Sequence, residues 1–146
     1  MQRAERLLRG AGTGDDAIAL DHESRFLRRR RLVTRGGRAF LVDLAETVSL
    51  DHGDALVLDD GTRIVVEAAP EPLLQVAGDL PRLAWHIGNR HTPCEIGADR
   101  LWIRADPVLA DMLARLGADT QEVTRPFRPE GGAYGHGRTH GHAHDG

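Results

Sequence analysis

The sequence predicts an α+β protein with a small N-terminal all-β domain, a second domain of strands and two helices, and a disordered His-rich tail. Three observations predict it: short apolar runs alternate with turn residues over 17–69, two capped helical patterns lie between later strands, and the chain ends in glycine and histidine. Its 146 residues suffice for one ordinary domain or two very small ones. We expect domains at 1–70 and 71–131 and the tail at 132–146.

Two β-hairpins characterise the first domain. LVTRGGRAFLV places Gly36 and Gly37 between apolar runs, and LVLDDGTRIVV does the same with Asp60 and Gly61. We therefore expect a small antiparallel β-domain. The proline-containing segment AAPEPLL favours extended backbone and is interpreted as a linker, with the domain boundary near residue 71.

The second domain follows the order β-α-β-β-α-β. A strand at Leu73–Val76 precedes Asp79, which caps a first helix that Gly88 ends. The runs CEI and LWI flank GADR as a hairpin, Asp106 followed by proline caps a second helix, and TQEVTRPF is the last strand. This order is the ferredoxin-like one, with two helices on one face of a four-stranded antiparallel sheet. The alternative is a single mixed domain.

Charge and missing motifs exclude several function classes. The chain carries 19 basic residues, all arginine, against 22 acidic ones, so its net charge of −3 gives no overall attraction for nucleic acid or an anionic membrane. No apolar run spans a membrane or forms a secretory signal, so we expect a cytoplasmic protein. Without lysine, GxxxxGK[ST], GxSxG, HExxH or paired CxxC, the sequence predicts no enzyme.

The C-terminal segment GGAYGHGRTHGHAHDG carries the strongest chemical signal. Its histidines are interleaved with glycine and other small or polar residues, and imidazole is the commonest ligand for borderline transition metals. So few apolar side chains cannot offset chain entropy, which predicts a disordered tail that exchanges its ion rapidly. The alternative is an expression artefact or a merely solvating terminus. The candidate metal ligands in the tail are His136, His140, His142 and His144.

The segment WHIGNRHTPC carries the second signal. His86 and His91 are five residues apart and do not share a helical face, so the two alone do not make a convincing metal site. Cys94 is either a soft ligand or a buried small hydrophobe, and it has no disulfide partner within the chain. His22 and His52 are interpreted as solvated turn histidines.

Four consecutive arginines occupy Arg28–Arg31. A phosphate-binding patch is one interpretation. Strand alternation would send two of the four to each face, and charge on an edge strand discourages aggregation, so we favour a structural role.

The residues just described resemble the urease accessory nickel metallochaperones of the UreE family. The resemblance rests on HIGNRHTPCEI at 86–96, DPVLADMLARLGADTQEV at 106–123 and FRPEGGAYGHG at 127–137, followed by the histidine tail. GDALVLDDGTRIVVEAAPE at 53–71 matches more loosely. GNRH together with PEGGAYGHG and the tail makes a fairly specific pattern.

The resemblance implies a homodimer joined through a ferredoxin-like metal-binding domain, preceded by a β-domain that resembles a peptide-binding chaperone domain. It implies that His91 is a metal ligand at the dimer interface, where a two-fold axis pairs it with its own copy. It also implies delivery of Ni²⁺ to the urease apoprotein and its accessory proteins, including the nickel-insertion GTPase. Zn²⁺ or Cu²⁺ would also bind such nitrogen ligands in vitro, so the choice of nickel comes from the resemblance.

Two alternatives remain open beside this nickel carrier. A small metal-dependent hydrolase would need an acid or base beside a stably held ion, and Glu95 and Asp99 are the closest candidates. A protein-interaction module whose tail only stores zinc or nickel is the other.

Overall fold

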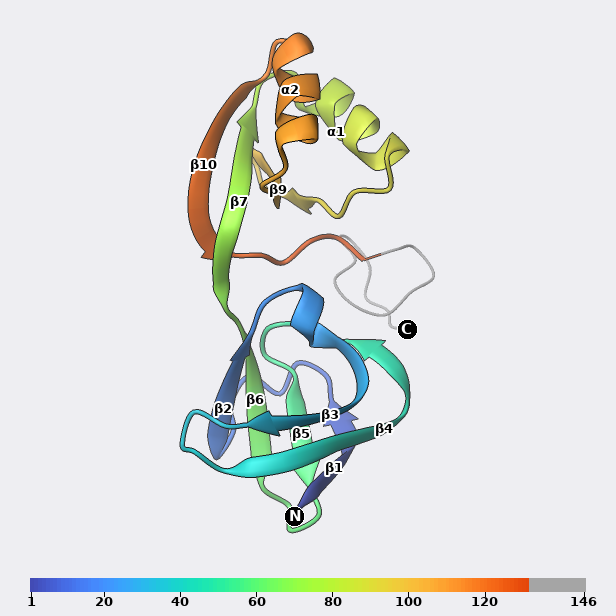
Figure 1. The fold of residues 1–146 in the computed structure, drawn as a ribbon, viewed down its shortest axis with the longest axis vertical. Helices are drawn as coiled ribbons and strands as arrows, with labels where there is room; N and C mark the ends of the chain where they lie inside the picture. The colour runs from blue at the N-terminus through green and yellow to red at the C-terminus, as the bar shows by residue number, and fades with distance from the viewer. Residues whose placement is uncertain (132–146) are drawn as a thin grey trace. The chain divides into compact units, whose positions relative to one another are not determined.

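A computed structural model describes residues 1–131 of the chain, which divides into two compact units at Met1–Ala69 and from Pro70 onward (Figure 1). The class is mixed α+β, mostly strands with two helices, as the sequence predicts. Within the described residues, neither helix has the length and apolar character needed to span a membrane.

The first unit is a six-stranded sheet with the order β2-β6-β5-β1-β4-β3. The expected hairpins are confirmed at β3–β4 and β5–β6, where each pair is antiparallel. The buried core contains Phe40, Leu56 and Ile64 among a dozen apolar side chains. The strands are β1 (Arg3–Leu8), β2 (Asp16–Leu20), β3 (Phe26–Val33), β4 (Ala39–Ser49), β5 (Ala55–Leu58) and β6 (Arg63–Ala68), and a short 3-10 helix, η1, covers Glu23–Arg25.

The expectation of a purely antiparallel first domain is wrong. Strand β1 pairs in parallel with β4, and β2 pairs in parallel with β6. Parallel neighbours cannot be joined by a tight turn, so these pairings lie between segments distant in the sequence, and turn residues do not reveal them. In β1 only Ala4 is fully buried. Its short sequence RAERLL therefore lacks the alternation of apolar and polar residues that would predict a strand.

Strand β3 lies at one edge of this sheet. All of Arg28–Arg31 are exposed, and Arg29, Arg30 and Arg31 pair in continuous register with β4, so successive side chains alternate between the two faces of the strand. Arg29 lies 3.7 Å from the Asp43 carboxylate on β4, and Arg28 donates to the Leu44 carbonyl at 3.2 Å. The charged edge strand therefore matches the structural interpretation of the arginine run.

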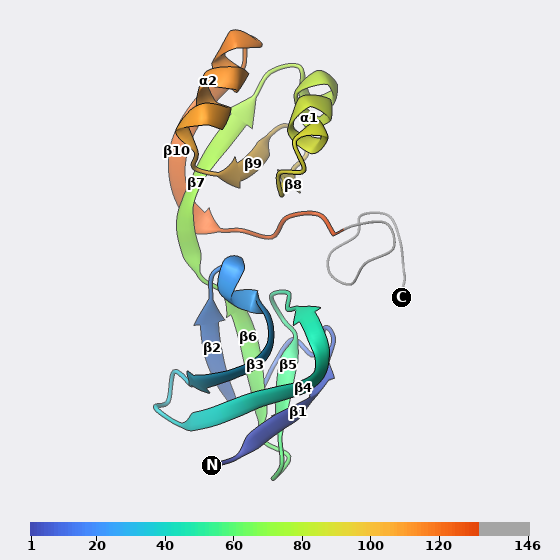
Figure 2. The same cartoon turned by 45° about the vertical axis from the view of Figure 1, so that its right-hand side comes forward.

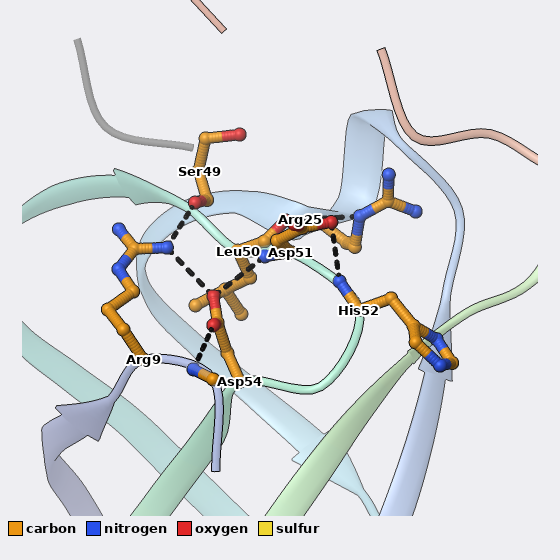
Figure 3. A network of polar contacts seen from close by, with 8 residues as sticks. Arg9, Arg25, Ser49, Leu50, Asp51, His52 and Asp54 are labelled. Carbon is orange, nitrogen blue, oxygen red and sulfur yellow. Dashed lines mark hydrogen bonds and ion pairs between the residues drawn. The ribbon is translucent and has the colours of Figure 1, made fainter. Parts of the chain in front are cut away.

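Buried polar contacts tie the loops of the first unit together (Figure 3). The Asp54 carboxylate, 3% exposed, accepts the Arg9 guanidinium at 2.8 Å and the backbone N–H groups of Gly10 and Asp51 at 3.0 and 2.8 Å. Arg25 is 1% exposed, and its guanidinium donates to the Leu50 carbonyl at 3.1 Å. The Asp54 carboxylate and the Arg25 guanidinium are therefore both buried with hydrogen-bond partners.

The second unit has the element order β-α-β-β-α-β, and its four strands form a sheet in the order β10-β7-β9-β8 with every pair antiparallel. Both helices lie on one side of the sheet (Figures 1 and 2). Their residues Leu83, Ile87 and Leu113 pack with strand residues such as Leu74 and Ile103. The elements are β7 (Pro70–Ala77), α1 (Leu80–Asn89), β8 (Glu95–Ile96), β9 (Leu101–Arg104), α2 (Pro107–Arg115) and β10 (Asp119–Pro126).

Both expected helix caps are confirmed. The Asp79 carboxylate accepts the Arg82 N–H at 3.4 Å, and the Asp106 carboxylate accepts the N–H groups of Val108 and Leu109 at 2.8 and 3.2 Å. Each carboxylate satisfies donors that a helix start leaves without intrahelical partners. The helices therefore begin where the sequence indicates.

The interpretation of AAPEPLL as a linker is wrong, because β6 ends at Ala68 and β7 already begins at Pro70. Pro70 and Pro72 pair with β10, whereas β9 pairs with β7 only from Leu73 onward. The Pro72 carbonyl accepts the Ala105 N–H at 3.4 Å, so the backbone of this residue faces away from β10. Proline has no N–H to donate. At Pro70 and Pro72 the missing donor faces the side of β7 where β9 has ended, so it interrupts no pairing with β10.

Candidate metal centre

His91 occupies the turn that ends helix α1. The His91 N–H donates to the Gly88 carbonyl at 3.0 Å, and the Thr92 N–H reaches back to the Ile87 carbonyl at 3.4 Å. These two bonds form a Schellman motif, in which the residue after the C-cap adopts the left-handed conformation. His91 has φ 55°, the single positive value among the non-glycine residues of 1–131. A position that favours glycine thus carries a histidine, and backbone strain of this kind is concentrated at functional sites.

The His91 residue is exposed and lines a surface hollow of about 390 Å³. The hollow lies between the turn after α1 and the end of β9 with the start of α2. Arg104 and Asp106 bring one charge of each sign to its wall, and Asp106 is engaged in capping α2. The full lining is His91, Thr92, Pro93, Arg104, Ala105, Asp106 and Leu109.

The other side chains of this segment are less suited to binding a metal. His86 is half-buried on α1, and its ring packs edge-on against Trp85 with centroids 5.0 Å apart. Cys94 is also half-buried, and burial, with smaller contributions from the charges of Glu130 and Glu95, raises the pKa of its thiol to about 11. Burial therefore makes this thiol less available to a metal than an exposed cysteine would be.

The two histidines of the first unit lie at turns, and only His52 is exposed as expected. His52 is exposed, but its Nδ1 accepts the Ala68 N–H at 3.1 Å, which ties the turn after β4 to the end of β6. His22 is half-buried at the start of the 3-10 helix η1.

His91 is the only expected metal ligand that the structure places. His136, His140, His142 and His144 lie outside the described residues. Within 1–131, no three histidine, cysteine, aspartate or glutamate side chains converge as a metal-binding group. A site built on His91 therefore needs ligands from outside this part of the chain.

The two acids considered for a hydrolase are not arranged around an open site. Glu95 is 6% exposed and accepts the Arg128 N–H at 2.8 Å and the Arg125 guanidinium at 3.3 Å. Asp99 is exposed in the turn between β8 and β9. Sequence reasoning missed the role of Glu95, because its partners lie some 30 residues later in the chain.

Comparison with known families covers both units. The family model described as the N-terminal domain of UreE urease accessory protein matches residues 3–69. The model described as the C-terminal domain of UreE urease accessory protein matches residues 65–146. The two matches follow one another in the order of the two compact units.

Curated relatives give the same result, and each is named urease accessory protein UreE. The protein of Ruegeria pomeroyi is 63% identical over 131 residues, which cover 89% of this chain and 88% of the relative. That of Paracoccus denitrificans is 61% identical, with 93% and 88% covered, and that of Rhodobacter capsulatus is 57% identical, with 99% and 94% covered. The chain therefore belongs to the UreE family of urease accessory proteins, which serve urease maturation and are not themselves enzymes.

Proposed function

We propose that this protein is a homodimeric nickel metallochaperone that binds Ni²⁺ and transfers it, in the cytoplasm, to the urease apoprotein and its accessory proteins, including the nickel-insertion GTPase. The observation that carries the proposal is the exposed His91, whose backbone is in the left-handed conformation just after helix α1. The chain also belongs to a family that serves urease. Urease maturation requires an accessory protein that handles metal. A single exposed imidazole is suited to an ion that must leave again.

The missing ligands come from a second copy and from the tail. A two-fold axis near His91 pairs the residue with its own copy and supplies two nitrogen ligands. Trp85 on α1 and Val108 on α2 are 63% and 77% exposed, which is apolar surface that a second copy can cover. The Glu130 N–H donates to the Cys94 carbonyl at 2.8 Å, so the last described residues are held against the 91–94 segment that carries His91. His136, His140, His142 and His144 then complete the coordination.

The donor set agrees with nickel. With Cys94 half-buried, we take the ligands to be imidazole nitrogens with added oxygen positions, a set that Ni²⁺ accepts in octahedral or square-planar geometry. Zn²⁺ and Cu²⁺ compete for the same nitrogens in vitro. Nickel selectivity therefore lies in supply and in the partner proteins rather than in raw affinity.

The proposal assigns a role to each domain. Residues 71–131 form a ferredoxin-like metal-binding and dimerisation domain, supported by the element and strand order of the second unit. Residues 1–70 form the peptide-binding-like domain that the sequence resemblance implies, and the strand-rich first unit is where we place it. Residues 132–146 are the His-rich tail.

Nickel titration calorimetry on the full chain tests the site. His91→Ala and deletion of 136–146 should each lower the nickel stoichiometry, whereas His86→Ala, a control on the helix just before the His91 turn, should leave it unchanged. Activation of apo-urease by the tail-deleted form then separates delivery from storage, because a storage module loses all its effect with the tail. Intact nickel binding in a chain that carries both His91→Ala and the deletion would refute the site assignment.

A further inference from the structure

Strand β3 has one open edge. It pairs with β4 over Arg29–Val33 in continuous register, and within 1–131 no strand pairs with its other side (Figure 1). The turn after β3 is tied to β2, where the Arg35 N–H donates to the Ala17 carbonyl at 2.8 Å, so the open edge ends there. Along the open side, the backbone N–H and C=O groups of β3 that do not face β4 are available to a further strand.

The side chains along this edge form a charged row with apolar ends. The row is Arg29–Arg31, whose side chains are exposed and alternate between the two faces of the strand. Phe26 and Val33 stand at the two ends of β3 and are 62% and 56% exposed. An added strand would therefore meet positive charge in the middle of the edge and apolar surface at its ends.

The row keeps an excess of positive charge. The Asp43 carboxylate lies 3.7 Å from Arg29 but also 3.1 Å from Arg3 of β1, so one negative charge is shared between two guanidinium groups. Arg30 donates to a backbone carbonyl at 3.1 Å, which does not neutralise its charge. Within the described part of the chain, neither Arg30 nor Arg31 forms an ion pair.

The charge of this row decides which strand can be added. A second copy of β3, paired antiparallel about Arg30, would place Arg29 opposite Arg31 and Arg30 opposite its own copy. Like charges directly opposite one another destabilise a strand pair, so the arginines prevent two copies from joining here. A strand with carboxylates at these positions would instead gain a favourable pair at each arginine, on both faces. Protection of the edge from self-pairing and selectivity for an acidic strand thus have one physical cause.

We propose that the open edge of β3 binds an extended acidic segment of a partner protein, which adds as a strand with carboxylates opposite Arg29–Arg31 and an apolar residue beside Val33. In this binding mode the backbone hydrogen bonds supply affinity and the facing side chains supply selectivity. The inference rests on the proposed function, since it names the chemistry of the partner for the peptide-binding-like domain. It uses no residue of the hollow at His91.

Fluorescence anisotropy with a labelled peptide of sequence Val-Val-Glu-Glu-Glu-Val-Val tests the edge on the full chain. The peptide reads the same in both directions, so it offers acids to the arginines whether it adds parallel or antiparallel. Arg30→Gln combined with Arg31→Gln removes two attractive pairs and should weaken binding about 2- to 30-fold. Arg82→Gln combined with Arg115→Gln, at exposed arginines of α1 and α2, is the matched control and should bind the peptide normally.

Two changes to the peptide separate strand addition from simple attraction of charge. With lysine in place of the glutamates, binding to the natural chain should vanish and should appear in a chain that carries Arg30→Glu and Arg31→Glu. Methylation of the three glutamate nitrogens keeps the charge but blocks backbone donors, so it should weaken binding as well. In the natural chain, the acidic peptide should slow hydrogen exchange at β3 amides while the amides of β6 keep their rates.

Unchanged binding in the Arg30→Gln, Arg31→Gln chain would overturn the proposal, as would a natural chain that does not bind the acidic peptide. Equal binding of the methylated peptide, or of a single-stranded oligonucleotide, would show a general anion surface and also overturn it. Nickel titration of the same variant should give the natural stoichiometry, because His91 belongs to the other unit. Peptide binding without nickel binding would refute the metallochaperone alone, and nickel binding without peptide binding would refute the edge site alone.

Discussion

Replacing His91 by glycine should stabilise the second unit while it removes the metal ligand. The residue has φ 55° at the left-handed position of a Schellman motif. Any side chain with a Cβ is strained there, whereas glycine is not. The two effects of His91→Gly therefore go in opposite directions, which is the expected signature of a residue retained for function at the expense of stability.

The magnitude follows from two opposing terms. The left-handed conformation costs a non-glycine residue roughly 1–2 kcal/mol. Glycine loses about 0.5–1 kcal/mol more conformational entropy on folding. The net gain for His91→Gly is therefore about 0.5–1 kcal/mol, which corresponds to a rise of roughly 2–8 °C in the melting temperature of a domain of this size.

The assay is a thermal melt followed by tryptophan fluorescence. Both tryptophans of the chain, Trp85 on α1 and Trp102 on β9, belong to the second unit, so the signal reports that unit. His91→Ala is the control, because it removes the imidazole but keeps the Cβ and hence the strain. A glycine variant that melts at or below the temperature of the alanine variant would refute the strain at this position.

Four further changes test other parts of the structure. Asp54→Ala removes the acceptor of two backbone amides and one of the two acceptors of the Arg9 guanidinium, which keeps the Ser49 carbonyl, and should cost ~2–4 kcal/mol in urea unfolding followed by circular dichroism; an unchanged midpoint would contradict the network. Asp106→Ala should cost ~1 kcal/mol by the same assay, whereas Asp106→Asn, which keeps an accepting oxygen, should cost less. Gly14→Ala should cost ~1–3 kcal/mol, because the new Cβ would lie 2.7 Å from the backbone oxygen of Arg63; a stability equal to that of the natural chain would show that the backbone yields easily. The pKa of the Cys94 thiol is raised from 9.0 to about 11, so its alkylation should be slow at pH 8 and accelerate towards pH 11, and its contribution to stability should be complete below pH 9 and decline between 9 and 11; fast alkylation at pH 8 would contradict the burial.

Local features of the fold were predictable because a few neighbouring residues determine them. Asp79 and Asp106 begin helices since their carboxylates bind amides two or three residues later. Gly37 and Gly61 adopt positive φ in hairpin turns, as glycine does readily. The prolines of AAPEPLL correctly indicate extended backbone, but the conclusion that they form a linker fails, because they pair with Thr124 and Pro126 of β10, which lie far later in the sequence.

The sequence by itself determined the class of the protein, the hairpins, the helix starts and the likeness to UreE. Each of these depends only on the chemistry of neighbouring residues or on the spacing of motifs. Only the tertiary structure decided that β1 lies between β4 and β5, that His91 is strained, and that Glu95 holds the amide of Arg128. The physical reason is range. Parallel pairing and a carboxylate bound to an amide 33 residues away arise only when the whole chain packs, and no local pattern encodes them.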